Sequence, residues 1–195
     1  MDGEVQDHPA ARQTAPGTLR LVQEFVNTVD LEEETDRIGD AAALTAWLRE
    51  QGLLGAAEVA TARDQERAVA IREAVRGLLL ANTGAPVYPI ALSILNRTAA
   101  ECPIHVRFLS SGGTRLDSEV GGAHAAMARI LMAVHAAMSD GTWGRLKACR
   151  QDTCRWAFYD RSKNRSRAWC SMAVCGNRAK ARSYRERQGS PPERE

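Results

Sequence analysis

The chain has 195 residues, 44% apolar and 26% charged, which suffices for one ordinary core and a smaller appendage. No stretch reaches the ~20 consecutive apolar residues that span a bilayer, and the acidic, proline-bearing N-terminus is unlike a secretory signal. A cytoplasmic protein with no membrane partner is therefore expected. The net charge of +2 conceals an asymmetry, because residues 1–144 carry 12 Lys and Arg against 19 Asp and Glu, whereas residues 145–195 carry 14 against 5. Such a basic end is expected to bind a polyanion.

The predicted fold class is α+β, with a mostly helical N-terminal domain at 17–142 that follows a disordered tail at 1–16. Acidic residues at 30–36 predict a solvated loop. Alternating polarity then predicts a small antiparallel hairpin with strands at 104–109 and 114–120. Apolar residues spaced by three and four predict helices at about 18–29, 41–51, 56–81, 90–100 and 123–139.

Polar residues beside the first and third predicted helices are candidates for a ligand pocket. Asn27 and Thr28 follow an apolar helical stripe, and they could line a pocket together with Arg72 or Arg76. The alternative is a helix end whose side chains satisfy nearby backbone groups, and this alternative is favoured. No phosphate-binding glycine loop, nucleophile elbow or pair of catalytic carboxylates is recognisable, so the chain is predicted not to be an enzyme.

Four of the five cysteines lie within 27 residues, in two pairs with four residues inside each pair. Two such pairs joined by a loop can close a tetrahedron around one Zn²⁺ ion. A site of four thiolates has no open position for water and is structural. The predicted ligands are Cys149, Cys154, Cys170 and Cys175.

An iron–sulfur cluster, a set of unrelated buried thiols or a redox pair would also place cysteines close together in a chain. A thioredoxin-like redox pair has two residues between its cysteines where this chain has four, and the segment has few aliphatic residues to bury unrelated thiols. Cys102 stands apart in an apolar setting, where a lone thiol packs as a small hydrophobe, and is left out of the site.

Basic residues surround the cysteines. Four of them alternate along the chain between the two pairs and are expected to face solvent or a phosphate backbone. The residues after the last cysteine are good helix formers, which predicts a short basic helix that could enter a DNA groove. A solvated helix end or a contact with an acidic protein is the alternative. The predicted nucleic-acid contacts are Arg161, Lys163, Arg165, Arg167, Arg178, Lys180, Arg182 and Arg185.

The sequence Trp-Cys-Ser-Met at 169–172, followed by Cys-Gly-Asn-Arg-Ala-Lys at 175–180, resembles the CGNR zinc finger, over residues 145–188. The preceding region is similar to the ABATE domain through Phe-Val-Asn-Thr at 25–28, Trp-Leu at 47–48 and Ile-Arg-Glu-Ala-Val-Arg at 71–76. The resemblance implies a stress-induced transcription regulator, with a finger that binds nucleic acid and an N-terminal domain that senses a ligand. Residues 189–195 are expected to form a disordered tail.

The leading hypothesis is a zinc-dependent, DNA-binding transcriptional regulator. Its finger contacts DNA while the N-terminal domain senses a small-molecule effector or forms a homodimer, since a single finger offers few base contacts. Two alternatives remain at this point. One is a protein-interaction module, and the other is a small-molecule-binding protein or enzyme whose zinc finger is purely structural.

Overall fold

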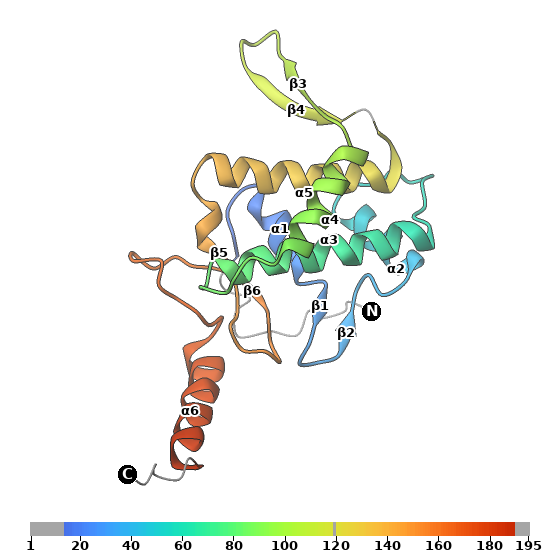
Figure 1. Cartoon of the computed structure of the whole chain (residues 1–195). Helices are drawn as coiled ribbons and strands as arrows, with labels where there is room; N and C mark the ends of the chain where they lie inside the picture. The colour runs from blue at the N-terminus through green and yellow to red at the C-terminus, as the bar shows by residue number, and fades with distance from the viewer. Residues whose placement is uncertain (1–13, 119, 190–195) are drawn as a thin grey trace.

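The structure is a computed structural model that describes residues 14–118 and 120–189. Helices form most of the body, and a long hairpin and the last helix project from it at opposite ends (Figure 1). This arrangement confirms the predicted mostly helical fold with small antiparallel strand pairs. The helices of the body are α1 (Leu19–Val26), α2 (Ala41–Glu50), α3 (Ala62–Ala81), α4 (Pro89–Glu101) and α5 (Gly122–Ser139).

Side-chain caps fix where two of these helices begin. Asp40 precedes α2 and accepts a hydrogen bond from the backbone N–H of Ala43 at 2.8 Å. Thr61 and Asp64 form a reciprocal capping box at the start of α3. The predicted start of this helix at residue 56 is therefore wrong, and Val59 lies in the preceding loop, where it is 69% exposed.

The first helix also ends earlier than the apolar stripe predicts. α1 stops at Val26, and a short hairpin follows in place of the expected acidic loop, with β1 (Val29–Asp30) antiparallel to β2 (Thr35–Asp36). The carboxylate of Asp30 accepts hydrogen bonds from two backbone N–H groups inside the turn, at 2.9 and 3.2 Å. The periodicity of apolar residues did not predict this hairpin, because its strands have only two residues each.

The longer hairpin confirms the predicted pair of strands. β3 (Ile104–Phe108) pairs with β4 (Thr114–Ser118), and Gly112 adopts a positive φ of 85° in the turn, where glycine is favoured. The hairpin extends away from the helices (Figure 1), so Val106 is 58% exposed and Phe108 is 82% exposed. Its apolar face thus lacks a covering within the described chain.

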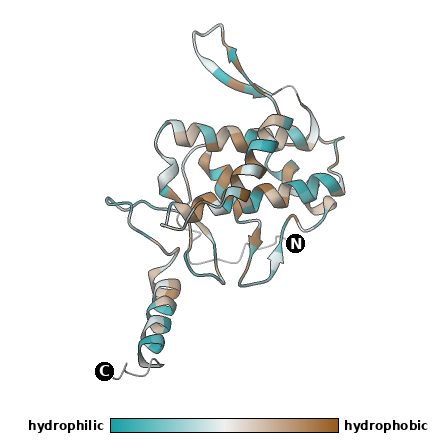
Figure 2. Cartoon of the chain, viewed as in Figure 1, coloured by the Kyte–Doolittle hydropathy of each residue, from teal (hydrophilic) through white to brown (hydrophobic). Residues whose placement is uncertain are grey.

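The main core extends beyond the N-terminal helices. It joins α1, α2, α3 and α5 to a third strand pair, β5 (Leu146–Ala148) and β6 (Ala157–Tyr159). Figure 2 shows apolar residues gathered in the middle of the helical body. Leu146, Ala148 and Ala157 are completely buried in this core. The boundary expected near residue 144 therefore lies within a single continuous hydrophobic core.

The described chain begins ahead of the first predicted helix. Ala15 is 4% exposed, and its backbone N–H donates to Gln23 Oε1 at 2.6 Å. Residues 1–13 and 190–195, which hold most of the two expected tails, lie outside the described residues. Among the described helices, none combines the length and apolar character needed to cross a membrane.

Candidate metal centre

Each metal ligand comes from a different local structure. Cys149 follows β5 directly and Cys154 lies in the turn that returns to β6, so the first pair brackets one antiparallel knuckle. The turn is closed by hydrogen bonds from Cys149 N–H to Trp156 and from Cys154 N–H to Gln151, at 2.9 and 3.0 Å. Arg155 has a positive φ of 52°, which lets the chain reverse here.

The second pair comes from a long loop and a short helix. Cys170 ends the loop, whereas Cys175 lies within a π-helical turn, η2 (Met172–Gly176), that leads into α6 (Asn177–Gly189). Ser171 begins this turn by accepting a hydrogen bond from the backbone N–H of Val174 at 3.3 Å. The last helix is therefore joined directly to a metal ligand.

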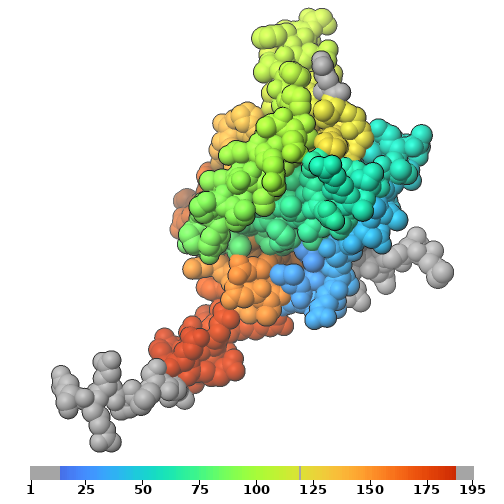
Figure 3. All heavy atoms as spheres, turned by 45° about the vertical axis from the view of Figure 1, so that its right-hand side comes forward, coloured from blue at the N-terminus to red at the C-terminus, as the bar shows by residue number. Residues whose placement is uncertain are grey.

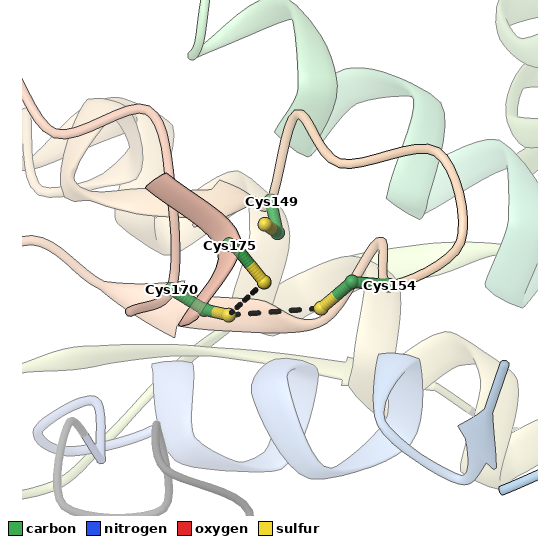
Figure 4. Close-up of side chains that lie close together, drawn as sticks. All are labelled: Cys149, Cys154, Cys170 and Cys175. Atoms are coloured by element: carbon green, nitrogen blue, oxygen red, sulfur yellow. Dashed lines mark hydrogen bonds between the residues drawn. The ribbon is translucent and has the colours of Figure 1, made fainter. Parts of the chain in front are cut away.

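The four sulfur atoms point toward one another in one buried cluster (Figure 4). All of them lie within 4.8 Å of one another, and Cys170 Sγ is 3.6 Å from the sulfurs of both Cys154 and Cys175. Four ligands at the zinc–sulfur distance of ~2.3 Å form a tetrahedron with edges of about 3.8 Å. The donor set and its size fit one structural Zn²⁺ ion, as predicted from the spacing.

The four thiols influence one another's ionisation because their sulfur atoms are in contact. Hydrogen bonds from Cys154 and Cys170 hold the pKa of Cys149 far below its usual range, at about 2. Donating those hydrogen bonds raises the pKa of Cys154 and of Cys170, and burial raises the pKa of Cys175. One thiolate thus opposes the ionisation of its neighbours, and a zinc ion would supply the positive charge that four thiolates require.

Aromatic residues form a second, smaller core around the metal ligands. Phe158 is completely buried among the four cysteines, and Trp156, Trp169 and Val174 pack against this cluster. The guanidinium of Arg167 lies 5.6 Å from the centre of the Phe158 ring and donates to the Cys170 carbonyl at 3.0 Å. These side chains form a small core around the metal ligands, and Arg167 is part of it.

A buried ion pair organises the loop between the two cysteine pairs. Lys147 and Asp160 are 2% and 0% exposed, and Lys147 Nζ lies 2.9 Å from Asp160 Oδ2. Lys147 also donates to the carbonyls of Arg165 and Arg167, while Asp160 accepts from the N–H groups of Ser162 and Arg167. Nothing in the sequence around Asp160 indicates that Lys147 is its partner, because the two residues are 13 positions apart.

The charge of Asp160 is maintained by this network. Burial alone would raise the pKa of its carboxyl group, but hydrogen bonds from Ser162 and Lys147 hold that pKa well below its usual range. A lysine and an aspartate that are this deeply buried need each other, since removal of either leaves an uncompensated charge. The buried side chains of Lys147 and Asp160 therefore fix the backbone of the loop at 160–167.

The predicted nucleic-acid residues of this loop have different surroundings. Arg161, Lys163 and Arg165 are exposed, whereas Arg167 is half-buried. Arg161 donates to the Thr14 carbonyl at 3.0 Å, and Arg165 adopts a positive φ of 50°. The segment forms no strand, so the expected alternation of exposed basic side chains does not apply to Arg167.

α6 presents the remaining basic candidates on a projecting helix (Figure 3). Arg178 pairs with Glu32 of the first hairpin, and Arg182 NH2 approaches Gln151 Oε1 at 3.5 Å. Lys180 and Arg185 are exposed, and Arg185 donates to the Ala181 carbonyl in its own helix.

Two of the four ligand-pocket candidates, Asn27 and Arg76, contact the finger, and the other two contact only the N-terminal domain. Asn27 exchanges two hydrogen bonds with the Ala157 backbone, at 2.9 and 2.7 Å. Arg76 donates to the carbonyls of Arg155 and Val26 at 2.8 and 2.7 Å, and Arg72 donates to Thr28 at 3.0 Å. All four side chains thus form hydrogen bonds to backbone or side-chain groups of the protein itself.

A cavity elsewhere on the N-terminal domain is lined by other residues. It has a volume of about 320 Å³ and lies between α3 and α4, with Ile71 and Ile94 among its apolar lining. Arg67 of α3 and Glu101 of α4 also line the cavity and form an ion pair at 2.7 Å. Cys102, just after α4, is completely buried and lies apart from the metal cluster.

Comparison with known families matches the two parts of the chain in order. Residues 19–141 match the ABATE family, whose description is "Putative stress-induced transcription regulator". Residues 145–188 match the CGNR zinc finger. A comparison with curated proteins finds no match. Neither matched family is an enzyme family, and both agree with the resemblance seen in the sequence.

Proposed function

The chain belongs to the ABATE family and carries a CGNR zinc finger, and on that premise we propose that it is a zinc-dependent, DNA-binding transcriptional regulator. The observation that carries this proposal is the projecting basic helix α6 beside a closed four-cysteine site. The metal has no chemical step to perform at a closed site. Its role is to hold the last helix and the preceding loop in a fixed orientation.

The dimensions and charge of α6 suit a DNA groove. Its 13 residues span roughly 20 Å, and the major groove of DNA, at about 12 Å wide, admits one α-helix. Arginine side chains can reach guanine edges or phosphates from such a helix. All residues at 181–187 are exposed, so entry into a groove needs no rearrangement of the core.

The loop at 160–167 supplies contacts of another kind. Arg161, Lys163 and Arg165 are exposed on this loop. The buried ion pair of Lys147 and Asp160 holds the loop backbone in place. Cations on a fixed loop contact phosphates without reading sequence, and such contacts set the register of a helix in the groove. We therefore assign both base and phosphate contacts to α6, and phosphate contacts alone to the loop.

The test is duplex binding by the zinc-loaded full chain across a range of salt concentrations. Each phosphate contact contributes about −0.9 to the slope of log K against log salt, so several contacts give a steep negative slope. The combined variant Lys180→Gln, Arg182→Gln and Arg185→Gln should lose affinity while it keeps one zinc per chain. The matched control removes the same number of charges from three exposed arginines on α3, α4 and α5, as Arg63→Gln, Arg97→Gln and Arg129→Gln. A flat slope rejects the proposal, as does unchanged affinity in the α6 variant.

We also propose that the exposed face of the long hairpin is where two copies of the chain associate. Ile104, Val106 and Phe108 lie on one face of β3, and Leu116 is the cross-strand neighbour of Val106. The charges of the other face are paired internally, since Arg107 contacts Asp117 at 2.7 Å. A two-stranded hairpin is only marginally stable alone, so a second apolar face would stabilise it. Light scattering should show a dimer that Phe108→Glu converts to a monomer.

A further inference from the structure

The first hairpin of the N-terminal domain reaches the basic helix of the finger. Its turn at 31–34 carries three consecutive glutamates, hereafter the acidic turn. Glu32 forms an ion pair with Arg178, which lies in the first turn of α6. The two residues are 146 positions apart in the sequence. The acidic end of the chain therefore touches the surface to which we assign DNA binding.

The acidic turn is held in place by contacts that do not involve its glutamate side chains. Asp30 accepts hydrogen bonds from the N–H groups of Glu32 and Glu33, which fixes the path of the backbone. At the base of the hairpin, Asp36 forms two hydrogen bonds with the buried guanidinium of Arg72, at 2.7 and 2.8 Å. The turn is thus presented to α6 in a fixed position.

The face of α6 that meets the acidic turn is one of its two basic faces. Arg178, Arg182 and Arg185 follow a spacing of four and three, so they share a face. The first contacts Glu32 and the second approaches Gln151, which places the beginning of this face against the body. Lys180 and Arg187 lie on the opposite side of the helix by the same helical period.

We propose that the acidic turn is an intramolecular competitor of DNA for Arg178. A guanidinium binds carboxylate and phosphate oxygens with the same pair of donors, so it can serve one of them at a time. The carboxylate competes at the high effective concentration of a tethered group, and the other two glutamates repel phosphates nearby. While Glu32 holds Arg178, duplex DNA is bound without the phosphate contact of this arginine.

This inference rests on the proposed DNA binding and makes a separate prediction. Glu32→Gln should raise duplex affinity by about two- to fivefold at low salt, the scale of one exposed ion pair. It should also make the salt slope steeper by about 0.9, because Arg178 then gains one phosphate contact. Glu66→Gln removes one exposed carboxylate from α3 and is the matched control for net charge.

The decisive comparison is a double-mutant cycle on the full, zinc-loaded chain. Arg178→Gln should weaken binding little in the wild type and strongly in the Glu32→Gln background, because the arginine contacts DNA fully only when the glutamate is gone. If the wild type binds duplex DNA but Glu32→Gln behaves like Glu66→Gln, the competitor proposal is wrong and the proposed function stands. If the wild type shows no salt-dependent binding, the proposed function itself fails.

Discussion

The two halves of the zinc finger are held by different forces. The inner half, residues 145–160, inserts a strand pair into the main core, where Leu146 and Ala157 are completely buried. The outer half, residues 170–189, is fixed mainly through two metal ligands and their aromatic surroundings, and its helix projects from the body (Figure 1). One metal ion thus joins a segment that belongs to the core to a segment that does not.

The inner half of the finger is therefore expected to contribute mainly to stability, and the outer half mainly to nucleic-acid recognition. The inner half buries the ion pair between Lys147 and Asp160, whereas the outer half leaves most of its basic side chains in solvent. Substitutions in the inner half should therefore change the free energy of unfolding. Substitutions on α6 should change nucleic-acid affinity and leave that free energy almost unchanged.

Loss of a metal ligand should have the largest effect on the free energy of unfolding, because the metal site joins both halves of the finger. Cys149→Ser should lower the unfolding free energy of the whole chain by more than about 3 kcal/mol and abolish stoichiometric zinc binding. Chemical denaturation and metal analysis measure the two effects. Cys102→Ala is the control, since that buried thiol lies outside the cluster and its loss should leave one zinc per chain. If the Cys149→Ser protein kept wild-type stability, zinc binding would not contribute to the stability of the core.

Removal of the buried cation should have the next largest effect. Lys147→Met leaves Asp160 buried without its ion-pair partner, which should cost about 3–5 kcal/mol. Lys163→Met makes the same chemical change at an exposed position of the neighbouring loop and should cost less than about 0.5 kcal/mol. Equal losses in the two variants would show that burial does not distinguish these lysines.

Loss of the hydrogen bonds between Asn27, just after α1, and the finger should have the third largest effect on the free energy of unfolding. Asn27→Ala leaves the buried N–H of Ala157 without its acceptor, at a cost of about 1–3 kcal/mol. Asn164→Ala, at an exposed position of the loop, is the control for the loss of an amide. Urea denaturation with zinc bound measures both variants. If Asn27 served only a ligand, its replacement would leave the stability of the free protein unchanged.

A smaller effect is expected from the ion pair at the base of the first hairpin, and it depends on pH. Burial opposes ionisation of Asp36, but hydrogen bonds from Arg72 and from the Ile38 N–H hold its pKa below the usual value. A lowered folded-state pKa stabilises the fold above the unfolded value of about 3.9, and this stabilisation disappears as pH falls through the folded value. Asp36→Asn should cost about 1–2 kcal/mol at pH 7 and progressively less below about pH 4, as unfolding experiments across this pH range would measure.

The sequence was sufficient for features that local pattern determines. The cysteine spacing predicted the metal cluster, and helical and alternating periods predicted five helices and the long hairpin. The capping box at Thr61 also has a recognisable sequence pattern, which could have corrected the early start assigned to α3.

Features that depend on tertiary pairing could not be predicted in this way. Nothing local to Lys147 indicates burial, because its partners, Asp160 and the carbonyls at 165 and 167, are brought to it by the fold. Asn27 and Ala157 are 130 residues apart, so their paired hydrogen bonds appear only in three dimensions. The same is true of Glu32 and Arg178, and of the core that continues from the N-terminal helices into the finger.

Hydrogen exchange of the full chain, with zinc bound and after its removal by a chelator, tests most directly whether the finger is part of the core. The amides of α6 should lose their protection without zinc, and those of β5, β6 and the contacting end of α1 should lose much of theirs as well. Loss of protection in α6 alone, with α1 and both strands unchanged, would contradict the account and show that the finger is an appended module.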